Sequence, residues 1–131
     1  MSIVTFDQAK RLFQIGFQEM TFGAYWRDSK AFKLFEYDSN WNKTADANGC
    51  YSAPDVPDAL QWFRDEKGII CAVERDVDWG EEHPFNGYYG GYSGTPEFTN
   101  KSTGVTESYP TFPEAESALL EALITYVEAK L

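Results

Sequence analysis

The sequence predicts an α+β fold. We expect a single domain over residues 1–131, with a mostly antiparallel sheet of about four or five strands and three helices in the order α-β-β-α-β-β-β-α. Three segments combine a helical apolar period with capping residues, and the segments between them have the patterns of short strands. No stretch has the composition of a linker. With 131 residues and 43% hydrophobic content, the chain is able to bury a core without metal or disulfide support.

The first helix is expected within TFDQAKRLFQIGF, residues 5–17. Thr5 and Gln8 have the spacing of a capping box, in which each side chain binds the backbone N–H of the other residue. Gly16 is expected to end the helix, because glycine readily adopts the left-handed conformation found there. The following TFGAYWRDSKAFKLFEY predicts two short strands around the polar turn RDSK.

The second helix is expected within SAPDVPDALQWFRDEKG, residues 52–68. Ser52 or Asp55 is its N-cap, since both side chains accept hydrogen bonds from free N–H groups at a helix start. Pro57 suits a first helical turn, and Gly68 has the position of a C-cap. The apolar face follows the spacing i, i+3, i+4 and i+7. It consists of Val56, Ala59, Leu60 and Phe63.

The next strands are expected in GIICAVERDVDW, FNGYYGGYSG and TGVTESYPTF. The first begins as an apolar run and then alternates, with acidic residues on one face and mostly apolar residues on the other. In the second, Tyr88 and Tyr92 share one face across Gly90, and Tyr89 takes the opposite face. The stretch WGEEHPFNGYYGGYSG therefore predicts a hairpin with Pro84 in its turn.

The third helix is expected within TFPEAESALLEALITYVEAKL, with Thr111 and Glu114 at capping-box spacing. Its apolar arc is wider than one sheet face usually covers. We expect the second stripe of this arc to be buried between elements, and the alternative is a homodimer through the last helix. That stripe consists of Leu120, Ile124, Val127 and Leu131.

Three segments together resemble a known family. TFDQAKRLFQIGF, YSAPDVPDALQWFRDEKGI and SYPTFPEAESALLEALITYV are similar in order and pattern to small uncharacterised proteins encoded in phages and mobile elements of gut bacteria. The resemblance covers the three helices, about half of the chain, and its motifs are caps and packing patterns. It implies a phage or mobile-element context and a bacterial cytoplasm. It carries over no activity and no catalytic residue.

The charge narrows the possible partners. The net charge is −10, from 21 acidic and 11 basic residues, which argues against nucleic acid and against anionic membranes. A basic protein partner stays open, and so does a role of the charge in solubility alone. No basic leader and no span long enough to cross a bilayer is visible, so we expect a cytoplasmic protein.

Catalytic patterns are weak. Every histidine-dependent triad would need His83, the only histidine, and no nucleophile motif accompanies it. The segment ERDVDWGEEH is rich in carboxylates, but its spacing does not match a calcium-binding EF-hand loop. We therefore assign no catalytic residue, no metal ligand and no cofactor. The alternative function is a small metal-dependent hydrolase centred on residues 74–83.

Protein recognition fits the sequence best. Aromatic side chains bury much area at low entropic cost and are favoured at interface centres. The expected binding surface has four aromatic residues with two acidic residues at the rim, and the alternative is that these rings belong to the core. The predicted residues are Trp79, Tyr88, Tyr89, Tyr92, Glu81 and Glu82. The sequence thus predicts a non-enzymatic, acidic, protein-binding accessory factor, and the resemblance adds the phage or mobile-element type.

Overall fold

A computed structural model describes residues 2–43, 49–77, 85–93 and 104–131. It confirms the α+β class, the three helices and the antiparallel pairing. The elements in chain order are α1 (Phe6–Gln14), β1 (Thr21–Trp26), β2 (Phe32–Ser39), the 3-10 helix η1 (Trp41–Lys43), β3 (Cys50–Ala53), α2 (Val56–Lys67), β4 (Ile70–Val77), β5 (Phe85–Ser93), β6 (Gly104–Val105) and α3 (Phe112–Glu128).

The strands form two three-stranded antiparallel sheets where the sequence had suggested one. The first has the order β2-β1-β3 and the second the order β4-β5-β6. The pattern missed β3, because its first residue ends a loop-like NGC stretch and its last two begin an SAP stretch that suggested a helix start. β3 pairs with β1 from Gly23↔Ala53 to Trp26↔Cys50. This pairing completes the first sheet and leaves β4 to begin a second.

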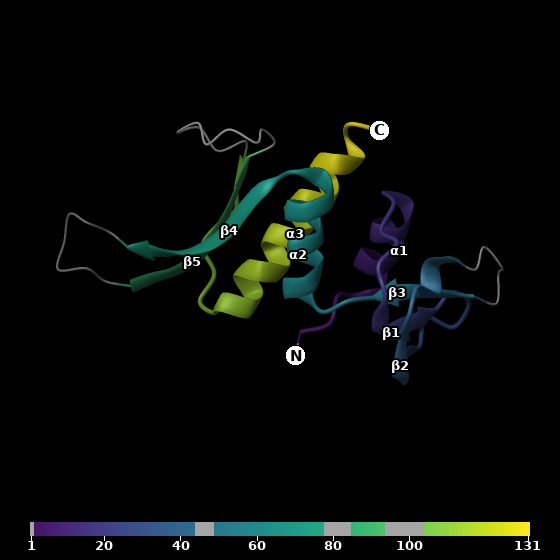
Figure 1. The fold of residues 1–131 in the computed structure, drawn as a ribbon. Coiled ribbons are helices and arrows are strands. Elements are labelled where there is room, and N and C mark those ends of the chain that lie inside the picture. The colour runs from purple at the N-terminus through teal and green to yellow at the C-terminus, as the bar shows by residue number, and fades with distance from the viewer. Residues whose placement is uncertain (1, 44–48, 78–84, 94–103) are drawn as a thin grey trace.

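The helices lie between and beside the two sheets (Figure 1). α3 packs against α2 and against β5, while α1 packs against β3 and α3. One cluster of buried apolar side chains joins these elements. It includes Ala9 and Leu12 of α1, Ala53 of β3, Leu60 and Phe63 of α2, Cys71 of β4, and Leu119 and Leu123 of α3.

The caps follow the predicted chemistry. Thr5 and Gln8 form the capping box, and Gly16 takes a positive φ of 102° just after α1. Asp55, rather than Ser52, is the N-cap of α2, and its carboxylate accepts the N–H of Asp58. Gly68 ends α2 in the left-handed conformation. Local hydrogen-bonding rules therefore predict the helix ends well.

The wide apolar arc of α3 is buried by the chain itself. Leu120 and Ile124 are fully buried and Val127 nearly so, while Leu131 at the end is exposed. This burial of the second stripe was the interpretation favoured by the sequence. Among the described helices, none is both long enough and apolar enough to span a membrane.

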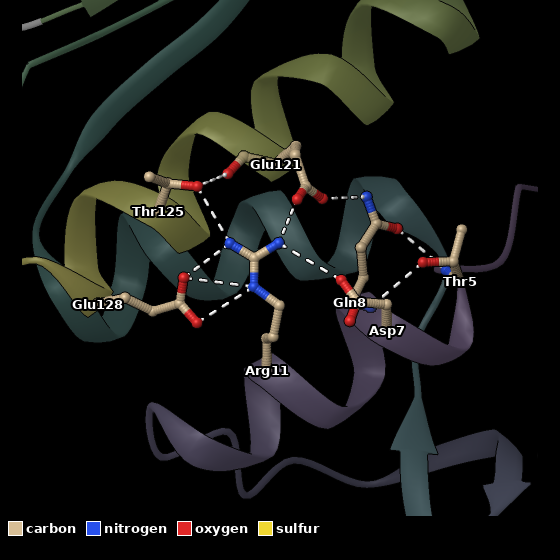
Figure 2. Close-up of polar contacts among 7 residues, drawn as sticks. All are labelled: Thr5, Asp7, Gln8, Arg11, Glu121, Thr125 and Glu128. Carbon is tan, nitrogen blue, oxygen red and sulfur yellow. Dashed lines mark hydrogen bonds and ion pairs between the residues drawn. The ribbon is translucent and has the colours of Figure 1, made fainter.

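Arg11 ties α1 to α3 through a network of polar side chains (Figure 2). Its Nη2 donates to Glu128 at 2.6 Å and to Thr125 at 3.0 Å, and its Nη1 pairs with Glu121. Gln8 donates to the second oxygen of Glu121 at 3.1 Å. The hydrogen bonds from Arg11 hold the pKa of Glu128 below its ordinary value. One guanidinium thus binds two carboxylates, Glu121 and Glu128, that lie two helical turns apart on α3.

Candidate functional site

Two of the predicted tyrosines face α3. The Tyr88 ring meets Phe112 edge-on at 5.5 Å between ring centroids, and Tyr92 packs on Tyr126 at 5.4 Å. Gly90 lies between them and allows close approach, since a Cβ there would lie 2.7 Å from the Leu119 Cβ. Both tyrosines are half-buried. The shared face expected for Tyr88 and Tyr92 is therefore confirmed, and this face packs against the last helix.

Tyr89 lies on the opposite face of the same strand. Its hydroxyl donates a hydrogen bond at 3.0 Å to the carboxylate of Glu74, which is the residue opposite Tyr89 on β4. Trp79, Glu81 and Glu82 lie outside the described residues. Of the predicted surface, the structure thus places two tyrosines against α3 and one on the outer face of the sheet.

A different region exposes large apolar side chains. Six of the nine exposed large apolar residues in the described part of the chain fall within residues 20–37, which concentrates them on the β1–β2 hairpin. They are Met20 (60% exposed), Phe22 (53%), Trp26 (37%), Phe32 (42%), Leu34 (56%) and Tyr37 (61%). A concentration of exposed large apolar side chains is typical of interaction surfaces. The sequence pattern did not predict this surface.

The signal for this surface was present in the sequence. FGAYW and FKLFEY carry apolar residues on both faces of their strands, which normally indicates burial on both faces. In the structure the rings of Phe6 and Phe13 on α1 pack on Tyr25 and Tyr51 of this sheet. Trp41 of η1 stacks on Phe35, with 4.1 Å between ring centroids. Phe22, Phe32 and Leu34 nevertheless stay exposed.

A groove of about 510 Å³ lies between this hairpin and α2. We call it the acidic groove. On the sheet side it is lined by Gly23, Leu34 and Ala53, which are neighbours across the three strands, and by Met20 and Phe22. On the helix side it is lined by Asp58, Gln61, Trp62, Asp65 and Glu66, and further lining residues are Ile3, Phe17, Glu19, Thr21, Pro54 and Asp55.

The groove is negatively charged. Five of its lining side chains are carboxylates, and none of the described residues that line it is lysine or arginine. Burial, and then the neighbouring Asp55, raises the pKa of Asp58. The recorded ion pairs of the described residues all belong to Arg11, away from this groove. Lys67 sits 5.3 Å above the Trp62 ring. Within the described residues, no lysine or arginine forms an ion pair with a carboxylate of the groove.

The groove does not resemble a metal centre or a nucleophilic site. Within the described residues no group of three or more His, Cys, Asp or Glu side chains could hold a metal ion. Cys50 and Cys71 are free and buried, and burial raises the pKa of both thiols, which keeps them protonated. Most of the segment 74–83 lies outside the described residues, so the metal-dependent alternative stays untested.

No family model, curated protein or solved structure matches this chain. The function is therefore inferred from the geometry of the hairpin and the acidic groove.

Proposed function

We propose that the protein is a non-enzymatic, acidic factor that binds another protein through the exposed apolar side chains of the β1–β2 hairpin. The observation that carries this proposal is the concentration of exposed apolar residues on one hairpin. Leaving such side chains in water is unfavourable, so a partner that covers them gains free energy. The phage or mobile-element type and the bacterial cytoplasm belong to this proposal, supported by the resemblance of the three helices.

The charge supports a protein partner rather than nucleic acid. A net charge of −10 repels phosphate and attracts basic surfaces. A basic protein surface would add electrostatic steering to the apolar contact. In this mechanism the factor occupies a basic surface of a host protein.

The test is a pull-down from bacterial lysate with a double variant, Phe22→Ser with Leu34→Ser, and a matched control, Leu131→Ser. All three side chains are exposed, so folding should be preserved, which circular dichroism checks. We expect wild type and the control to retain the same partner at low salt and the double variant to lose it. A partner retained equally by the double variant, or no partner at all, contradicts the proposal.

A further inference from the structure

We infer that the acidic groove is the place where the partner is recognised, and that its occupant is a protein segment with lysine or arginine side chains beside large apolar ones. This inference rests on the proposed function and adds the site and the chemistry of the partner. It depends on two walls of different character that face one space: apolar side chains of the hairpin and carboxylates along α2.

The carboxylates point to a cation supplied from outside. Asp58 is partly desolvated and lies next to Asp55, and both effects disfavour its charged form. Asp55 already caps α2, and Asp65 accepts a hydrogen bond from Gln61, but neither contact brings a positive charge. An incoming ammonium or guanidinium group would neutralise this wall without displacing an ion pair of the described chain.

The spacing of the acids favours a chain of cations over a single ion. Asp58 and Asp65 are seven residues apart on α2, which corresponds to about 10 Å along the helix axis. Ligands of one metal ion lie about 2 to 2.6 Å from it, so this pair is too widely separated to share one. Two cationic side chains on one partner segment match this separation.

The opposite wall requires apolar groups on the same segment. Met20, Phe22 and Leu34 line the groove and are more than half exposed. A purely hydrophilic polycation would leave them in water. A segment in which cations and large apolar residues lie side by side contacts both walls at once, and this combination gives selectivity as well as affinity.

The cations of the β1–β2 hairpin are poorly placed to fill this role in a second copy. Arg27 lies between the rings of Phe13 and Tyr51, 4.6 Å from each centroid. Lys30 and Lys33 also lie over rings of their own chain. Two copies would in addition bring together two net charges of −10. The occupant is therefore assigned to a different protein.

The test uses three synthetic twelve-residue peptides as probes, built from lysine and leucine, from lysine and serine, and from glutamate and leucine. Titration calorimetry on the full chain measures each at low and moderate salt. We expect the lysine–leucine peptide to bind most tightly and the glutamate–leucine peptide not to bind. If the lysine–leucine and glutamate–leucine peptides bound equally tightly, the groove would act as an apolar surface without selectivity for cations. That result would overturn the inference.

A pair of variants with equal charge change locates the binding. Asp58→Asn with Asp65→Asn alters the groove, and Glu107→Gln with Glu114→Gln removes two exposed acids that neither line the groove nor lie on the hairpin. We expect the groove variant to bind the lysine–leucine peptide at least tenfold more weakly than wild type. The affinity of the control variant should change less than twofold. If both variants lose the same affinity for the peptide, only the net charge of the protein determines binding, and the inference is rejected.

The same two variants in the lysate pull-down separate this inference from the proposed function. A partner lost by the groove variant and kept by the control supports both. If the groove variant keeps the partner but Phe22→Ser with Leu34→Ser loses it, the proposed protein-binding function stands and the groove is rejected as the recognition site. Sedimentation checks for a homodimer. If the wild type dimerises and Asp58→Asn with Asp65→Asn abolishes the dimer, the occupant of the groove is a second copy of the chain, and the inference of a different protein is rejected.

Discussion

The two sheets have similar strand compositions but different surroundings. Both contain aromatic residues and a central glycine, yet the rings of β5 that face inward are half-buried while several of the β1–β2 hairpin are exposed. The difference lies in the helix that covers each sheet. α3 has 17 residues and α1 has nine, so their lengths are about 25 Å and 14 Å. Exposure of a strand's rings is thus decided by the covering helix rather than by the strand.

The largest expected difference in stability is between truncating a buried leucine beneath β5 and truncating an exposed leucine on the hairpin. Leu119→Ala should lower the free energy of unfolding by about 3 kcal/mol, because it empties a fully buried site. Leu34→Ala, in contrast, should cost at most about 0.5 kcal/mol, since Leu34 is 56% exposed. Urea denaturation of both variants measures the difference. Equal costs would show that the hairpin is covered in solution, for example by another chain.

Neighbouring glycines of β5 provide a second comparison. A Cβ on Gly90 would collide with Leu119, whereas a Cβ on Gly91 meets nothing within 4 Å. Gly90→Ala should therefore cost about 1 to 3 kcal/mol, because the sheet must move away from α3. Gly91→Ala should change stability by less than about 1 kcal/mol. Thermal unfolding of the two variants decides this, and a neutral Gly90→Ala would mean that β5 does not pack tightly on α3.

The sequence predicted what local chemistry determines. Thr5, Asp55 and Gly68 have their predicted roles, because caps depend on residues within one turn. The alternation of β5 also placed Tyr88 and Tyr92 on one face. The second sheet was missed because pairing between β1 and β3 joins residues 24 to 30 positions apart, which no local pattern predicts.

The candidate site was harder to predict for the same reason. The acidic groove joins β1, β2 and α2, and three of its five acids occupy ordinary positions of an amphipathic helix. A solvated helix face and one wall of a groove have the same sequence pattern. The exposure of Phe22 and Leu34 depends on the short reach of α1, which only the packing reveals.

The contact of α1 with α3 gives a smaller and pH-dependent effect. Arg11→Met should cost about 1 to 2 kcal/mol at neutral pH, since it removes hydrogen bonds to Glu128 and Glu121 that are partly solvated. Lys10→Met is the control, because Lys10 is an exposed neighbour on the same helix. Chemical denaturation at neutral pH compares the two, and equal stability would contradict the role of Arg11.

The pH dependence has a definite sign. The folded pKa of Glu128 lies below its ordinary value of 4.5, so its pairing with Arg11 stabilises the protein fully at neutral pH. This stabilisation is lost as the pH falls below about 4.5 through the lowered folded pKa. Melting temperatures of wild type and Arg11→Met should therefore converge in acid. A difference that stays constant down to about pH 2.5 would show that Glu128 is not the group concerned.

The smallest effect on stability is expected at Tyr89. Substitutions of this residue also distinguish most directly between the β1–β2 hairpin and the outer face of β5 as the binding surface. Tyr89→Phe removes an exposed hydrogen bond to Glu74 and should cost about 0.5 kcal/mol or less. If the hairpin carries the binding, Tyr89→Ser should retain the partner that Phe22→Ser with Leu34→Ser loses. Loss of the partner in Tyr89→Ser alone would transfer the binding surface to the outer face of β5, where the sequence pattern placed this residue.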